Sequence, residues 1–225
     1  MPSDAGNQIT IWSIVSLLAG TIISAIVSYL LQRRSFSESR QQKEKDKFEA
    51  RKTLGLNLFH KMIRIASTLE ILNRSLDEAS ALAKVAKFDG QPWQIVMPLA
   101  NFPNRVKFTP EELTFLMLMD MTLFNDMAPF DDIQDSLLGM FELYRTKRMA
   151  LTDTLPAKMS GSRGTTDLNE AGMIKIAPKA TELNSLIQGM IQRTQQDSKE
   201  AWELLEKLRN LLNKEFNLQL RLEQK

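Results

Sequence analysis

One uncharged apolar stretch near the start of the sequence, residues 9–31, constrains the fold more than any other feature. It runs for 23 residues without Asp, Glu, Lys or Arg, and twelve of the 23 are Ile, Leu or Val. A bilayer core about 30 Å thick needs roughly 20 helical residues, because each residue adds about 1.5 Å. We therefore predict a single transmembrane helix here, since a core helix of this length normally carries a polar face.

A cleaved signal peptide is the alternative interpretation of the same stretch. Such a peptide has a basic start, a shorter apolar run of about 7–15 residues and a small-residue cleavage site. Here Asp4 is the one charged side chain before the stretch, and no good cleavage site follows it. The stretch is therefore predicted to be an uncleaved signal-anchor.

The basic residues predict how the chain is oriented. No Lys or Arg precedes the stretch, and eight follow it within residues 32–52: Arg33, Arg34, Arg40, Lys43, Lys45, Lys47, Arg51 and Lys52. Because basic residues stay on the cytoplasmic side, we expect residues 1–8 outside the cell membrane and the large C-terminal part in the cytoplasm. The absence of cysteine fits a reducing compartment.

Residues 32–52 are predicted to be a basic juxtamembrane stalk or a linker. Their net charge is +4, and Arg33, Arg34, Arg40 and Lys43 are expected to contact anionic lipid headgroups. Nucleic acid is not an expected partner, because the whole chain carries only +2 and no aromatic-rich basic face accompanies these residues.

Small residues recur every four positions along the predicted span, at Ser16, Gly20, Ser24 and Ser28. This spacing lets two helix backbones approach closely, and the hydroxyl groups can hydrogen-bond across the contact. We expect a homo-oligomer held through this face, or packing of this face against a partner's helix; small residues are also common in spans that do not associate.

Residues 53–225 predict a helical bundle. Between residues 58 and 86, apolar residues alternate spacings of four and three, which is a heptad-like seam of the coiled-coil type. The seam comprises Leu58, Met62, Ile65, Leu69, Leu72, Leu76, Ala79, Ala83 and Ala86, and it is widened by Leu54, Ile63, Ile71, Leu82 and Val85. A face this wide favours a bundle over a two-stranded coiled coil.

A second long helix is expected from about Pro178 to Arg221. Its seam includes Leu204, Leu208 and Leu211, and the polar Thr194 and Asp197 interrupt it. With two shorter helices between the long ones, the fold class is all-α: an antiparallel bundle of about four helices with short connections.

Two predicted loops separate these helices. Residues 89–108 contain three prolines and no helical period, so we expect a loop with Trp93, Ile95, Val96 and Phe102 partly buried. A loop of this length inside a compact domain is a candidate interaction surface. Residues 157–172 are rich in Gly, Ser and Thr and are expected to be the most flexible part.

The segment after Thr109 is apolar nearly all round. Thr109 has the position of a helix cap, and the run that follows is too short to span a bilayer. It is expected to form one helix, ended by Pro129, that fills the core or meets a partner through Met117, Met119 and Met121. Asp120, the single charge within residues 113–124, is expected to pair with a basic partner in the core or in another subunit. A further helix then runs to Pro156.

No pattern of catalytic residues stands out. The chain has one histidine, His60, and no cysteine, which makes a zinc site unlikely on composition alone. Residues 161–166 lack the spacing of a phosphate-binding loop. We expect no enzyme activity, no cofactor and no metal site.

The sequence therefore predicts a non-enzymatic, single-pass membrane scaffold that self-associates and holds a protein partner, of unknown identity, at the membrane. One alternative is an oligomeric channel subunit with a pore lined by Ser16, Ser24 and Ser28. Another is a cytoplasmic ligand-sensing bundle that uses residues 89–108 and 157–172.

Overall fold

The computed structural model describes residues 5–155, 158–160, 163–165 and 170–222, with the side chains of residues 28–155 and 170–222. By its internal contacts the chain divides into two compact units, Met1–Arg51 and Lys52–Lys225. Helix α1 (Ala5–Val85) contributes residues to both units.

The first unit is helical over its described residues. Every described side chain from residue 28 to residue 51 is exposed. Ion pairs within the helix link Arg34 to Glu38 (2.9 Å) and Lys47 to Glu44 (3.1 Å). Such exposed pairs support a helix by only about 0.3–0.5 kcal/mol each. Residues 32–52, predicted as a stalk or a linker, are therefore α-helical.

The second unit is a helical bundle, as predicted. After α1 its elements are α2 (Pro92–Ile95), α3 (Pro110–Met119), α4 (Met121–Met127), α5 (Phe130–Thr152), β1 (Lys158–Ser160), β2 (Arg163–Thr165) and α6 (Glu170–Phe216). Between the two longest helices, α2, α3 and α4 have only 4, 10 and 7 residues, whereas α5 has 23.

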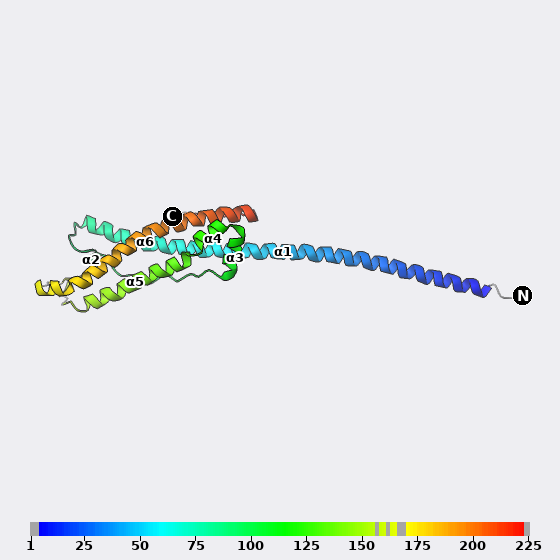
Figure 1. Ribbon diagram of the computed structural model, residues 1–225, viewed down its shortest axis with the longest axis horizontal. Helices are drawn as coiled ribbons and strands as arrows, with labels where there is room; N and C mark the ends of the chain where they lie inside the picture. Colours follow the sequence, from blue (N-terminus) through cyan, green and yellow to red (C-terminus); the bar gives the residue numbers. More distant parts are fainter. Residues whose placement is uncertain (1–4, 156–157, 161–162, 166–169, 223–225) are drawn as a thin grey trace. The chain divides into compact units, whose positions relative to one another are not determined.

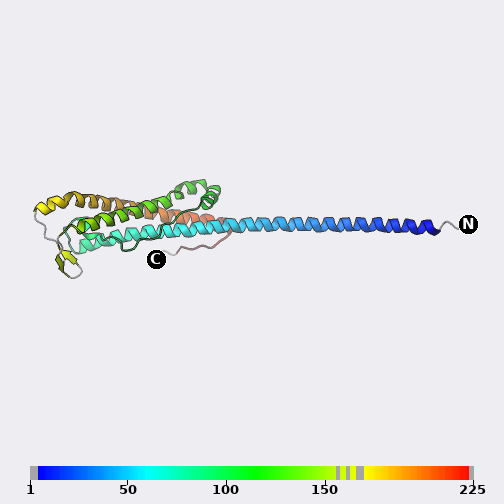
Figure 2. The ribbon, with the colours of Figure 1, turned by 90° about the horizontal axis from the view of Figure 1, so that it is seen from below.

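The directions of the long helices differ from the prediction that all neighbours are antiparallel. Within the second unit, α6 runs opposite to α5, but α5 runs in the same direction as the bundled part of α1 (Figures 1 and 2). The reason is the segment of residues 86–109, which returns along the length of the bundle before α3 begins. Because this segment carries the chain back to the end of the bundle where the bundled part of α1 begins, α5 starts near that end and runs in the same direction as α1.

The core is built first of all on α1. The six large seam residues from Leu58 to Leu76 are between 0% and 1% exposed, and they face buried residues of α3, α5 and α6. Full burial of one such side chain stabilises the fold by about 1.5–3 kcal/mol. Beyond Leu76 the seam leaves the core: Ala79 is partly buried, and Ala86 is exposed.

On α6 the buried face drifts away from the predicted heptad seam. Leu204 and Leu208 are buried, but Ser198 replaces Asp197 at the core, and Leu212 replaces Leu211, which is only partly buried. A straight α-helix has 3.6 residues per turn, so a face drawn at 3.5 falls behind by about 20° per heptad.

Polar residues do lie in this face of α6. Thr194 is fully buried, and its hydroxyl donates to the Asn73 side chain of α1 (3.3 Å) and to the Ile191 carbonyl (3.2 Å). Asp197 lies beside the core with Arg193 3.7 Å away, and burial raises the pKa of its carboxyl group above the usual value. The polar pair Thr194–Asn73 therefore ties α6 to α1 at one register.

Helix α6 starts earlier than predicted, at Glu170, so Pro178 lies inside it. A proline inside a helix removes one hydrogen bond, here to the carbonyl of Ile174. Both residues are exposed, so solvent can reach the freed carbonyl group.

Both long helices end with a residue at positive φ. At the end of α6, Asn217 has φ 50°, and the Leu218 amide donates to the Asn213 carbonyl (3.2 Å). The Asn213 side chain accepts from the Leu220 amide (2.9 Å) and holds the extended residues that follow. Helix α6 therefore ends at Phe216, before the predicted end at Arg221.

The end of α1 repeats this geometry. Lys87 has φ 49°, and the Phe88 amide donates to the Ala83 carbonyl (3.0 Å). This pairing of a left-handed residue with a bond back to the last turn is the Schellman motif. It satisfies carbonyl groups that a helix end otherwise leaves open.

A short hairpin follows α5, where the sequence predicted the most flexible loop. Strands β1 and β2 are antiparallel, with Met159 opposite Gly164. Residues 157, 161–162 and 166–169 of that predicted loop lie outside the described residues.

Two glycines predict opposite effects of the same substitution. A Cβ atom at Gly55 of α1 would lie 2.6 Å from Leu212 and 3.2 Å from Phe115, whereas one at Gly139 of α5 would meet nothing within 4 Å. Gly55→Ala should therefore destabilise the bundle by about 1–2 kcal/mol through overpacking. Gly139→Ala should stabilise it by about 0.5–1 kcal/mol through helix propensity.

Denaturant unfolding followed by circular dichroism measures both effects on the full chain in mild detergent. If both variants were stabilised, the close approach of α1 to α6 at Gly55 would be refuted.

Candidate interaction surfaces

The corner between α3 and α4 is the first candidate surface, and Asp120 creates it. Asp120 has extended backbone angles (φ −155°, ψ 103°), and its carboxylate accepts from the Leu123 amide (2.9 Å). It is thus the N-cap of α4. The prediction of one continuous helix is wrong, and within the described chain the Asp120 carboxylate caps α4 and does not pair with a basic side chain of the core. The preference of Asp for N-caps was the signal available in the sequence.

The corner divides the apolar run into an inner and an outer face. Leu116, Leu123 and Met127 are buried. On the outer face Leu118 is 77%, Met121 55% and Met117 36% exposed. Met119 is partly buried against the core, so the three methionines predicted as a partner surface do not share one face. The outer face of the corner, defined here as Met117, Leu118 and Met121, includes the unpredicted Leu118.

Helix α3 is fastened at its start by a buried ion pair. Glu112, whose side chain is 4% exposed, accepts from Lys61 Nζ of α1 (2.7 Å) and from the Thr109 amide (2.7 Å). The Thr109 hydroxyl in turn accepts from the Glu112 amide (3.3 Å), which completes a capping box. The direction in which the corner points is therefore set by α1.

The returning segment, residues 86–109, is the second candidate surface, and α5 holds it in place. The Tyr144 hydroxyl donates to the carbonyls of Val96 (2.6 Å) and Trp93 (3.3 Å), and Arg148 Nε donates to the Trp93 carbonyl (3.0 Å). Burial raises the pKa of Tyr144 to about 12. Backbone amide and carbonyl groups outside helices and strands lack regular hydrogen-bond partners. Where this segment packs on the core, side chains must therefore supply them.

The same fastening continues toward the start of α5. The Val106 amide donates to the buried Gln134 side chain (2.9 Å), and the Phe108 amide donates to Asp131 (3.2 Å). Arg105 pairs with Asp135 of α5 at 2.9 Å.

On the outside of this segment, Lys107 donates to Asp132 (2.6 Å), and this hydrogen bond raises the pKa of the lysine. This segment was predicted to be a candidate interaction surface, but many of its hydrogen bonds and ion pairs are made to α5. Of the predicted buried residues, Trp93 and Val96 are buried, and Ile95 and Phe102 are partly buried.

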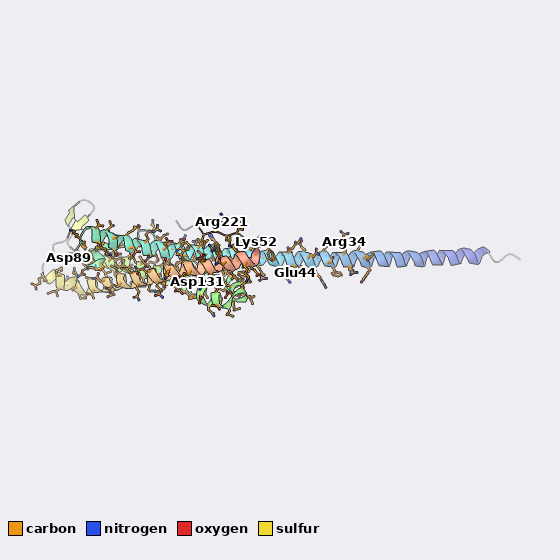
Figure 3. The ribbon with its side chains drawn as sticks, turned by 90° about the horizontal axis from the view of Figure 1, so that it is seen from above. Arg34, Glu44, Lys52, Asp89, Asp131 and Arg221 are labelled. Atoms are coloured by element: carbon orange, nitrogen blue, oxygen red, sulfur yellow. The ribbon has the colours of Figure 1, made fainter. Side chains whose placement is uncertain are left out.

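The predicted lipid-contacting residues Arg33, Arg34, Arg40 and Lys43 are all exposed on the first unit, where Figure 3 shows Arg34 and Glu44 pointing away from the helix. Of the predicted association face, Ser28 is exposed, whereas Ser16, Gly20 and Ser24 lie outside the residues whose side chains are described. His60 is exposed on α1.

Residues 9–27 of the predicted span likewise lie outside the described side chains. Across the helices as far as they are described, no stretch is both long and apolar enough to cross a membrane. The same residues contain no group of three or more His, Cys, Asp or Glu side chains arranged to hold a metal ion.

A shallow hollow of about 320 Å³ lies between α4 and α6. Charged side chains dominate its lining, and Asp126 and Lys207 face each other across it at 3.9 Å. Small-molecule sites are usually concave and mostly apolar, so this hollow does not favour the ligand-sensing alternative.

Comparisons with known proteins assign no family. No family model matches the chain, and neither a curated protein nor a solved structure is significantly similar to it.

The Tyr144 hydroxyl predicts a pH-dependent loss of stability. Tyr144→Phe removes the donor of the Val96 carbonyl and one of the two donors of the Trp93 carbonyl, which keeps Arg148, and should cost about 1–2 kcal/mol. Because the folded state raises the pKa from 10.0 to about 12, the neutral phenol is favoured on folding. Its contribution is complete below pH 10 and is lost as the pH rises toward 12.

Urea unfolding at pH 8 and at about pH 11 measures this contribution. The difference in stability between the two pH values should be smaller in Tyr144→Phe than in the unmodified chain. Tyr29→Phe is the matched control, since Tyr29 is 63% exposed. Equal pH dependence in all three proteins would contradict the role of Tyr144.

The Asp120 cap predicts a local effect. Asp120→Ala should weaken the start of α4 by about 1 kcal/mol, whereas Asp120→Asn retains an acceptor and should change it little. Hydrogen exchange measured by mass spectrometry over residues 121–127 reports this directly. Faster exchange in both variants would show that the carboxylate acts by its charge and not as a cap.

Proposed function

We propose that this protein is a non-enzymatic, single-pass membrane protein that self-associates through its span and holds a protein partner at the membrane. One observation carries the proposal: residues 9–31 contain no charge, and eight basic residues follow by residue 52. A stretch of this length is solvated well by lipid and poorly by water.

The C-terminal end of this stretch, where the structure describes the side chains, supports the same proposal. Leu30 and Leu31 are 55% and 63% exposed, so no other described part of the chain covers them. Of the eight basic residues that follow, all but the half-buried Lys52 are exposed. Each cation near an anionic leaflet contributes about 1 kcal/mol of attraction. The proposed location is the cell membrane, with the bundle in the cytoplasm.

The partner surface in this proposal is the outer face of the corner. Met117, Leu118 and Met121 are exposed there, and methionine adapts well to varied apolar surfaces. Residues 111–135 contain seven acidic and no basic residues, although several are engaged in caps and ion pairs. A partner with an apolar centre and a basic rim matches this surface best.

The anchor is tested by extraction of the full chain from native membranes. We expect the protein to stay in the membrane pellet after alkaline carbonate treatment and to need detergent for release. Release by carbonate alone would refute the anchor.

Self-association is tested with one substitution and a matched control in the same helix. Gly20→Leu should shift the chain toward monomer in detergent, because a large side chain separates the two backbones. Ile22→Phe adds bulk about 160° away from Gly20 around the helix, opposite the small-residue face, and should leave the assembly unchanged. Mass photometry measures both. A monomeric unmodified chain, or equal loss in both variants, would contradict association through this face.

A further inference from the structure

Two helices of the bundle extend past its core at the same end. On α1 the fully covered residues stop at Leu76, yet the helix continues to Val85 and its cap to Phe88. On α6 the first buried residue is Ala180, although the helix begins at Glu170. Figure 3 places Asp89, just beyond the end of α1, at the end of the bundle where α6 begins.

Both extensions carry large apolar side chains that the bundle does not cover. Leu82 is 67%, Val85 84% and Phe88 46% exposed beyond the core of α1. Met173 and Ile174, on α6, are 53% and 69% exposed. We call these five side chains the apolar tip. Short helical segments without packing are marginal in water, so a helix with such residues on its free end is expected to meet an apolar surface.

The charges around the apolar tip indicate which surface. Lys84, Lys87, Lys175 and Lys179 are exposed on the two extensions, and none pairs with an acid among the described residues. At the outer ends of the extensions, residues 82–89 and 170–179, these four lysines stand against Asp89 and Glu170, a net charge of +2, and Asp77 and Glu78 lie nearer the core on α1; residues 53–225 as a whole carry −1. Apolar side chains flanked by lysines are the composition of helices that lie in an anionic lipid interface.

We propose that the apolar tip is a lipid-binding site that inserts into the surface of an anionic phospholipid bilayer. The apolar side chains enter the boundary between headgroups and acyl chains, and the lysines contact the phosphates. This contact is separate from the span of residues 9–31, and it holds whether or not that span anchors the chain.

The test uses a single label at the tip, because the chain contains no cysteine of its own. Val85→Cys is labelled with an environment-sensitive fluorophore in the full chain, which is held in phosphatidylcholine nanodiscs. Vesicles of phosphatidylcholine, with or without phosphatidylglycerol, are then added. We expect the fluorescence to shift to the blue only with the vesicles that contain phosphatidylglycerol. Brominated acyl chains in those vesicles should quench the label. The same label at Glu203→Cys, on the side of α6, should not respond.

Matched charge variants decide the role of the lysines. Lys84→Gln with Lys87→Gln should raise the lipid concentration for half-maximal response by about fivefold for each lysine removed. Lys199→Gln with Lys207→Gln removes the same charge from the middle of α6, away from the apolar tip, and should leave that concentration unchanged.

Two results would overturn the proposal. One is an equal response to both kinds of vesicle or to neither. The other is a blue shift that grows with protein concentration without added vesicles, which would identify a second copy of the chain as the occupant. Incorporation into nanodiscs reports on the span, so failure of the anchor is distinguished from failure of the tip.

Discussion

The bundle depends above all on burial of the α1 seam. Six large side chains between Leu58 and Leu76 lose nearly all contact with water, and α3, α5 and α6 pack around them. Gly55 extends this packing by one turn, because only a residue without a Cβ atom lets Leu212 and Phe115 approach so closely.

A second constraint is that the irregular backbone beside that core needs hydrogen-bond partners. The returning segment has almost no helix of its own, so its amide and carbonyl groups need other partners. Helix α5 supplies them through Tyr144, Arg148 and Gln134. This arrangement explains why α5 can run parallel to α1 without a long connecting helix. It also explains why the segment contributes less open surface than a free loop of its length.

The exposed apolar residues of the bundle fall into two places with different chemistry. The outer face of the corner stands beside acidic residues, some of which serve as caps and ion pairs. The apolar tip stands among lysines on two helices that continue past the core. Surfaces of opposite charge select different partners, since like charges brought together at a contact cost free energy. This difference is why we propose a basic protein partner for the first surface and an anionic lipid surface for the second.

Much of the helical content was readable from local patterns, but the path of the chain was not. The 4–3 spacing from Leu58 to Leu76 predicted the buried face of α1, because a helix brings such residues onto one side whatever surrounds them. The cap at Thr109 predicted the start of α3 for the same local reason. The break at Asp120 was missed, since an apolar run alone does not distinguish one helix from two.

Only the tertiary structure decided which apolar residues stay uncovered and which way α5 runs. Leu58 and Leu82 belong to the same wide apolar face in the sequence, yet one is buried and the other exposed. Periodicity reports what a helix offers on each side. The position along α1 at which the neighbouring helices no longer cover it depends on long-range packing. No local sequence pattern encodes that position.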